Sequence, residues 1–193
     1  MERYSKNPIL TRNDIPDIPP YLTDVTSVFN PGAIKINGKY ILILRVQSRS
    51  RETFFMVAES KDGVKFRVQR DIVKFSGMEN VKGKIFHIYD ARIVEIGNLF
   101  YIMFAMDMEE GCQLGIATTG DFKKFEFLGI VSNGDIRNGV LFPEKVFGKY
   151  LRYDRPNILR KEGGPTSGSQ IFLSESDDLI HWKEIGPVLN GRF

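Results

Sequence analysis

The sequence has 193 residues, of which 42% are hydrophobic and 26% are charged, as expected for a globular protein with a sizeable buried core. Its net charge of +3, from 27 basic and 24 acidic residues, argues against a nucleic-acid-binding protein, in which a basic stripe is expected. The single cysteine, Cys112, excludes an internal disulfide, and no stretch approaches the roughly 18 apolar residues of a membrane span, so we expect a cytoplasmic protein without a membrane partner.

Strand hairpins follow one another along the chain. The first is AIKINGKYILIL (33–44), and similar patterns recur as RIVEIGNLFYIMF (92–104) and EKVFGKYLRY (144–153). Each has an apolar strand, a glycine-centred turn, and a second strand with Tyr or Phe near its start. The turn glycines are Gly38, Gly97 and Gly148. The Asn37-Gly38 pair favours a type I′ turn, because both residues tolerate positive φ.

A second element closes each repeat. It reads ESKDGVKF (59–66), TTGDFKKF (118–125) and ESDDLIHW (175–182), and each copy has an aspartate four residues before an aromatic side chain. The simplest interpretation is an outer hairpin, in which the aspartate accepts hydrogen bonds from turn amides and the aromatic residue fills the gap between sheets. We therefore predict a structural role for these aspartates.

Three units of nearly 60 residues, each with about four strands, are typical of β-propeller blades. The sequence thus predicts an all-β protein, in which residues 1–193 belong to a single propeller domain. Three blades do not close a ring of four to eight, so we expect the domain to be incomplete at its C-terminus. Open edges on the first and third blades would favour association with a second copy.

Polar residues near the inner strand of each repeat are the candidates for a site. Asp90 lies between Tyr89 and an apolar strand, a setting that would exclude water from its carboxyl and favour the protonated form that a general acid needs. The alternative is a salt bridge with Arg92, because residues two apart share one face of a strand. The pattern leaves both interpretations open.

A basic group of residues would suit a small anion, since guanidinium groups bind phosphate with two hydrogen bonds. The group consists of Arg45, Arg49, Arg51, Arg137, Asn138 and Lys145. Ordinary solvated surface is the alternative for each, except that Arg45 follows an apolar run and is hard to place in water. A second arginine cluster is Arg152, Arg155 and Arg160. His87 and His181 lack the spacing of a metal site, so no metal is expected.

Four stretches together resemble the family 130 glycoside phosphorylases and hydrolases. They are DVTSVFNPGAIKINGKYILILRVQSR (24–49), IYDARIVEIGNLFYIMFAMD (88–107), FKKFEFLGIVS (122–132) and RNGVLFPEKVFGKYLRYDRPN (137–157). The resemblance implies a five-bladed propeller, of which this chain supplies about three blades, acting on β-mannosides. It also implies that Asp90 donates a proton through a hydroxyl of the bound mannose while inorganic phosphate, a co-substrate, attacks the anomeric carbon. The product would be α-mannose 1-phosphate, an inverting outcome, with no cofactor.

The same resemblance implies substrate- and phosphate-binding residues. They are Asn30, Arg45, Arg51, Arg137, Asn138, Lys145, Asp154 and Arg155. The expected substrate is a β-1,4-linked mannoside, either a mannooligosaccharide or mannosylglucose. Two alternatives stay open. One is a propeller hydrolase with Glu144 as base, and the other is a non-catalytic carbohydrate-binding fragment.

Overall fold

A computed structural model describes residues 4–157 and 168–191 of the chain. Regular structure in these residues is almost entirely β-strand, with two 3-10 helices, η1 (Arg12–Asp14) and η2 (Met78–Asn80), so the predicted all-β class is confirmed. The chain divides into two compact units, residues 1–74 with 89–91, and residues 75–88 with 92–193. That residues 1–193 form one domain stays a prediction.

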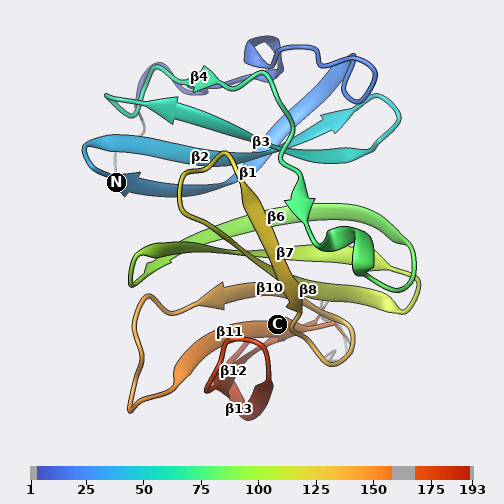
Figure 1. Cartoon of the computed structure of the whole chain (residues 1–193), viewed down its shortest axis with the longest axis vertical. Helices are drawn as coiled ribbons and strands as arrows, with labels where there is room; N and C mark the ends of the chain where they lie inside the picture. The colour runs from blue at the N-terminus through green and yellow to red at the C-terminus, as the bar shows by residue number, and fades with distance from the viewer. Residues whose placement is uncertain (1–3, 158–167, 192–193) are drawn as a thin grey trace. The chain divides into compact units, whose positions relative to one another are not determined.

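The first unit contains an antiparallel sheet in the order β1-β2-β3-β4 (Figure 1). Its strands are β1 (Val25–Ile36), β2 (Lys39–Ser48), β3 (Thr53–Ser60) and β4 (Arg67–Val68). The turn between β1 and β2 has φ of 45° at Asn37 and 74° at Gly38, which confirms the predicted type I′ turn.

The segment that precedes β1 covers one face of this sheet. Leu22 is fully buried and Ile15 nearly so, and both pack against residues of β2 and β3 such as Leu44 and Met56. The segment begins its helix η1 with a capping box, in which Thr11 and Asp14 exchange hydrogen bonds. The hairpin repeats gave no sign of this covering segment.

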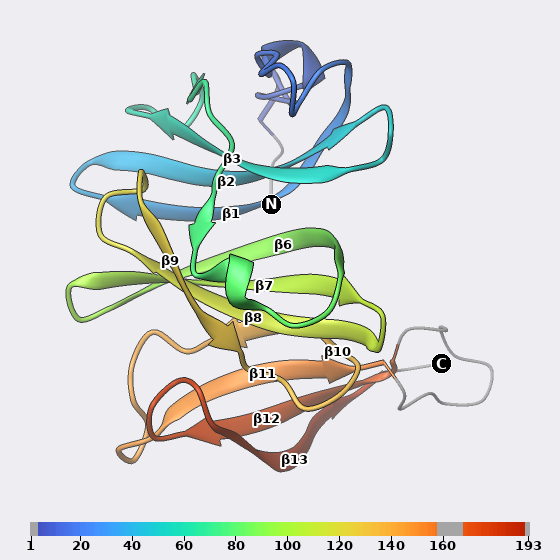
Figure 2. The same cartoon turned by 45° about the vertical axis from the view of Figure 1, so that its right-hand side comes forward.

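The second unit contains two sheets, with strand orders β5-β9-β8-β7-β6 and β10-β11-β12-β13 (Figure 2). The strands of the first are β5 (Phe75–Ser76), β6 (Ile85–Ile96), β7 (Leu99–Met108), β8 (Gly111–Thr119) and β9 (Phe125–Ile130). Those of the second are β10 (Ile136–Leu141), β11 (Tyr150–Pro156), β12 (Gln170–Ser176) and β13 (Trp182–Asn190). The fifth strand, β5, pairs in parallel with β9, which differs from the predicted sheet of four antiparallel strands. Strand β5 was not predicted, because its two residues are too few to show the alternation of apolar and polar side chains that indicates a strand.

A shared core joins the two sheets of the second unit. Met103 and Leu114 of the first sheet pack with Leu141 of β10. Gly139 allows this close approach, because a Cβ atom there would lie 2.8 Å from Leu114 Cδ1. The path of β10 is thus fixed by packing against the preceding sheet.

The closing elements have the structural role that was predicted. In each, one carboxyl oxygen of the aspartate accepts two backbone N–H groups of the turn. The aspartates are Asp62, Asp121 and Asp178. These hydrogen bonds lower the pKa of Asp62 to about 2 and also lower the pKa of Asp121. The aromatic residues that follow all contribute to the cores. They are Phe66, Phe125 and Trp182.

Across the described ranges, 4–157 and 168–191, no helix is long and apolar enough to cross a membrane.

Candidate active site

Arg45 is the centre of a polar cluster in the first unit. It lies on β2 directly opposite Phe29 of β1, so both side chains share one face of the sheet. The Arg45 guanidinium lies over the rings of Phe29 and Tyr89, with its Cζ 4.3 Å and 4.8 Å from the two ring centroids. Both distances fall within the range of cation–π attraction, so the two rings help to hold the guanidinium in place. The apolar run before Arg45 therefore does lead into a sheltered position, where the side chain is 19% exposed.

Asp90 receives two hydrogen bonds on a single carboxyl oxygen. Its Oδ1 accepts from Asn30 Nδ2 at 3.0 Å and from Arg45 Nη1 at 3.1 Å. The side chain is 17% exposed, which agrees with the predicted sheltered carboxyl. Oδ2 accepts no hydrogen bond from any described residue. One oxygen is therefore fixed while the other is available to a substrate hydroxyl.

The partner of Asp90 was not apparent from the local sequence. Arg92, two residues further on, is the nearest cation in the chain, whereas the ion pair forms with Arg45, 45 residues away. Sequence reasoning placed Tyr89 beside Asp90, but it missed the contacts of the Phe29 and Tyr89 rings with Arg45. A signal was present, because Phe29 and Tyr89 each stand immediately before a polar candidate, Asn30 and Asp90.

The turn after β2 contains two of the basic candidates, Arg49 and Arg51, whose surroundings differ. Arg49 pairs in solvent with Asp24, and this carboxylate raises the pKa of Arg49. Arg51 has a left-handed φ of 69°, and its carbonyl accepts a hydrogen bond from Gln47. The exposed Arg51 side chain makes no hydrogen bond or ion pair with a described residue. Arg51 is therefore available to an anion, while Arg49 already has a partner.

The remaining basic candidates lie in the second unit. Arg137 of β10 stands directly opposite Arg155 of β11, so two cationic side chains share one face of this sheet. Arg137 is half-buried, and its Nε is buried without a hydrogen-bond partner among the described residues. Its neighbour Asn138 is half-buried and makes no side-chain hydrogen bond within the described ranges. Lys145 is exposed, with its Nζ 4.3 Å from the ring centroid of Tyr150.

Comparison with known proteins identifies the family. Residues 1–190 match the glycoside hydrolase family 130, described as beta-1,4-mannooligosaccharide phosphorylase. The chain belongs to family 130. It is 29% identical to a beta-1,4-mannooligosaccharide phosphorylase of Ruminococcus albus, with 96% of this chain and 55% of that protein covered. It is 33% identical to a 4-O-beta-D-mannosyl-D-glucose phosphorylase of Bacteroides fragilis, over 93% of this chain and 49% of that protein.

A third relative has a solved structure. It is the beta-1,2-mannobiose phosphorylase of Listeria innocua, 24% identical over 92% of this chain and 62% of its own length. Its complex with beta-1,2-mannobiose superimposes with a TM-score of 0.81 at 22% identity, over 98% of this chain and 66% of that one. The family 130 chain thus has the predicted propeller fold, with three sheets that correspond to blades. It spans about half the length of the curated relatives it matches.

Asp154 of the family 130 chain is buried rather than open to a ligand. It forms an ion pair with Arg152 at 2.6 Å, and Ser174 Oγ donates a hydrogen bond to its Oδ2 at 2.7 Å. Arg152 also donates to the carbonyl of Val131, and its Cζ lies 4.2 Å from the ring centroid of Trp182. This buried pair supports the third sheet. Arg152, the first arginine of the second cluster, is therefore not available to an anion. Arg160, the last arginine of that cluster, lies outside the described residues.

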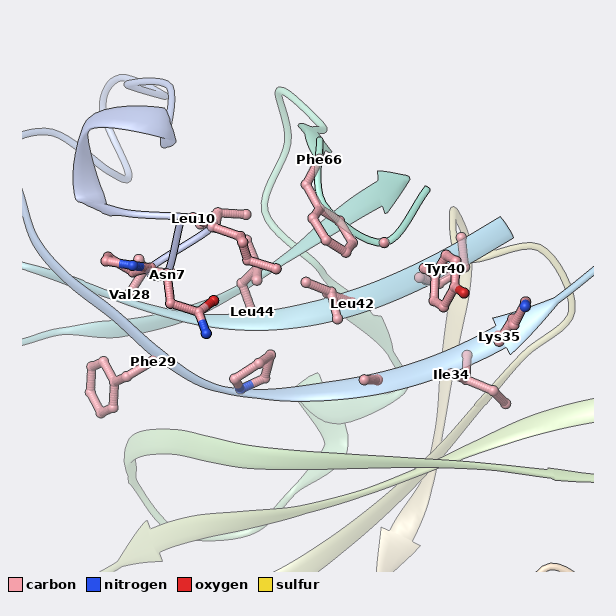
Figure 3. Close-up of a pocket in the computed structure, with 16 residues that line it drawn as sticks. Asn7, Leu10, Val28, Phe29, Ile34, Lys35, Tyr40, Leu42, Leu44 and Phe66 are labelled. Carbon is pink, nitrogen blue, oxygen red and sulfur yellow. The ribbon is translucent and has the colours of Figure 1, made fainter. Parts of the chain in front are cut away.

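An open pocket of about 810 Å³ lies in the first unit of the family 130 chain, over β1 and β2 (Figure 3). Leu10, Leu42, Leu44 and Phe66 gather around it, with Tyr40 and Lys35 at another part of its wall. Asp90 and Arg45 are not among the residues that line it. The pocket is an apolar hollow in the face of the sheet, and it lacks the convergent polar groups of a catalytic cleft.

Within residues 4–157 and 168–191, no group of three or more His, Cys, Asp or Glu is arranged to hold a metal ion.

Proposed function

We propose that this family 130 chain acts as an inverting phosphorylase of β-linked mannosides, with Asp90 as the proton donor. The observation that carries the proposal is the Asp90 carboxyl, which is sheltered, fixed through Oδ1 by Asn30 and Arg45, and open at Oδ2. A general acid needs such a fixed position near the glycosidic oxygen to which its proton is passed.

In the proposed reaction, a phosphate oxygen bonds to the anomeric carbon as the bond from that carbon to the glycosidic oxygen breaks. The proton of Asp90, passed through a mannose hydroxyl, is received by the departing oxygen. Phosphate replaces the base and the water of an inverting hydrolase, so a single carboxyl suffices. The product is α-mannose 1-phosphate, which has inverted configuration.

The basic residues supply the second requirement, cationic groups that bind an anion. We propose that Arg45 and Arg51 in the first unit, and Arg137 and Lys145 in the second unit, each contact phosphate or the reacting mannose. Arg137 supports this role because it is half-buried and has no counter-ion among the described residues. Burial of an unpaired cation is costly, and a bound phosphate would offset that cost. Asn30, Asn138 and Arg155 are proposed as further contacts, while the buried pairing of Asp154 argues for an indirect role.

The linkage is the finer part of the proposal. We propose β-1,4-linked mannosides as substrates, because the two relatives at 29% and 33% identity are named as phosphorylases of mannooligosaccharides and of mannosylglucose. The relative at 24% identity is named for a β-1,2 linkage, so both linkages belong in the assay.

The test is a product analysis. The protein is incubated with phosphate and either β-1,4-mannobiose or β-1,2-mannobiose, and mannose 1-phosphate and free mannose are quantified. We expect mannose 1-phosphate from the β-1,4 substrate and a loss of about 10²- to 10⁴-fold in Asp90→Asn, which keeps the shape but has no acidic proton. Asp71→Asn, at an exposed aspartate, is the matched control and should keep wild-type activity.

Other products would point to the alternatives. Phosphate-independent release of free mannose would indicate a hydrolase, and a loss of that activity in Glu144→Gln would then assign the base. Absence of both products, with the fold intact by circular dichroism, would indicate a binding module.

A further inference from the structure

Three residues with left-handed backbone occupy the same place in the three repeats. They are Asn30 in β1, Asp90 in β6 and Asn138 in β10, with φ of 42°, 56° and 59°. Each strand stands at the end of its sheet order and leads into the glycine turn of its repeat. The pairing register slips between Phe29 and Gly32 in β1, and between Arg137 and Val140 in β10. A left-handed residue inside a strand is therefore a repeated feature of this chain.

The left-handed residue has a geometric effect that is visible in the first unit. Consecutive side chains of a regular strand point to opposite faces. Here Tyr89 stacks on the Arg45 guanidinium while its neighbour Asp90 accepts a hydrogen bond from the same group. Likewise Phe29 stacks on Arg45, while Asn30 donates to the carboxyl that Arg45 holds. In both strands, two consecutive side chains reach one cluster, as a bulge permits.

Glycine would satisfy this backbone more easily. The repeats do use glycine where only the turn matters, as at Gly38, Gly97 and Gly148, around which a Cβ atom would meet nothing within 4 Å. Asparagine and aspartate are the side chains that best tolerate positive φ, yet they still carry strain that is typical of functional sites. At two of the three strand positions the side chain is used for a contact, because Asn30 donates to the Asp90 carboxyl and Asp90 also accepts from Arg45.

We propose that the left-handed residue is a positioning device, and that in the third repeat it turns Arg137 and Asn138 toward one shared ligand. This inference rests on the proposed function, since the ligand would be the co-substrate phosphate or the sugar beside it. Asn138 makes no side-chain hydrogen bond within the described ranges, and Arg137 Nε is buried there without a partner, so both side chains have donors to offer. Asn138 is a contact residue and also sets the direction of Arg137.

Two substitutions at one position separate the backbone from the side chain. Asn138→Gly removes the amide but keeps the left-handed bulge, whereas Asn138→Ala removes the amide and disfavours the bulge. We expect the KM for phosphate to rise about tenfold in Asn138→Gly, for the lost hydrogen bond to a charged group. In Asn138→Ala we expect a further rise of at least about fivefold, because Arg137 is also misdirected.

Asn37 provides the matched control. It has a φ of 45° in the exposed β1–β2 turn and belongs to no proposed site. Asn37→Gly and Asn37→Ala should differ in Tm in the same direction as the Asn138 pair, while their KM for phosphate stays at the wild-type value. Equal KM values for Asn138→Gly and Asn138→Ala would overturn the positioning role, and wild-type values in both would overturn the contact as well.

A binding readout keeps the inference separate from the proposed function. The rise in Tm with increasing inorganic phosphate is measured for the same four variants and the wild type. If the wild type responds to phosphate without turning over mannobiose, the proposed function fails, and the difference between the Gly and Ala variants still decides the positioning role. If the wild type does not respond to phosphate in either assay, the device has no anion to hold and the inference fails.

Discussion

Arg45 Nη1 lies 3.1 Å from Asp90 Oδ1, and both residues belong to the first compact unit although they are 45 residues apart in the chain. Its geometry suits a planar cation, because the guanidinium contacts the Phe29 and Tyr89 rings while one of its nitrogens donates to the carboxyl. An ammonium group could supply the charge but not this fixed plane. The position of the proposed proton donor is thus set by the shape of its partner as well as by charge.

Arg45→Lys tests whether that shape matters. We expect kcat/KM for phosphorolysis to fall about 10- to 100-fold, because a flexible lysine leaves the carboxyl poorly positioned. Arg49→Lys is the matched control, since Arg49 is exposed and pairs with Asp24 in solvent, and it should stay within about twofold of wild type. Wild-type kinetics in Arg45→Lys would mean that a positive charge alone is sufficient.

Asp154→Ala tests whether the Arg152–Asp154 pair is structural. Both side chains are almost fully buried, so removal of the carboxylate leaves an uncompensated guanidinium in the core. We expect the free energy of unfolding to fall by about 3–5 kcal/mol in urea titrations. In the double variant Arg152→Met/Asp154→Leu much of that loss should be recovered, because no charge is left buried. A stable Asp154→Ala protein with a raised KM for mannobiose would instead support direct substrate contact.

The sequence predicted the repeats well because their determinants are local. Asn37-Gly38 forms a type I′ turn by its own backbone preferences, and Asp62 caps amides within three residues of itself. The two-residue strand β5 and the covering segment around Leu22 were missed, because their positions come from packing against distant residues.

The site was predictable in part. Asp90 and Arg45 were singled out by their places beside apolar strands and again by resemblance, but their mutual contact spans 45 residues and no local pattern encodes it. Asp154 was grouped with the binding residues although its charge is used by Arg152, two residues earlier on the same strand face. The sequence pattern around a strand carboxylate is the same whether the side chain faces a channel or a core. Only the packing of the neighbouring strands decides between these two environments.

The pH dependence of stability should reveal the aspartates of the closing elements. The folded pKa of Asp62, about 2, lies below the value of about 3.9 for a free aspartate. Its hydrogen bonds therefore contribute fully above about pH 4, and their contribution is lost as the pH falls toward 2. We expect Asp62→Asn to lower the Tm at pH 6, and the difference from wild type to vanish near pH 2.

Asp17→Asn serves as the control for this measurement. Asp17 is exposed and makes no hydrogen bond or ion pair with another described residue. Its substitution should leave the difference in Tm the same at every pH. A difference for Asp62→Asn that did not change between pH 6 and pH 2 would show that the turn does not stabilise the ionised carboxyl.

Gly115 should be intolerant of a side chain because of the aromatic residues around it. It lies opposite Phe104 in the β7–β8 pair, and a Cβ atom there would be 2.8 Å from two ring carbons of Phe104 and 3.1 Å from one of Phe127. Phe104 is itself buried and stacked on Phe75 at a centroid distance of 4.8 Å, so its ring has little freedom to move. We expect Gly115→Ala to cost about 1–3 kcal/mol of unfolding free energy, measured by urea titration.

Gly120→Ala is the control that separates the effect of packing from the general effect of replacing a glycine. A Cβ atom at Gly120 would meet no atom within 4 Å, and its φ lies outside the left-handed region, so alanine fits the existing backbone. Gly120→Ala should be neutral or raise the unfolding free energy by up to about 1 kcal/mol, since alanine restricts the unfolded chain. Equal losses in both variants would point to a backbone effect of glycine replacement. A loss confined to Gly115→Ala would show that the rings of Phe104 and Phe127 limit how closely β7, β8 and β9 can pack.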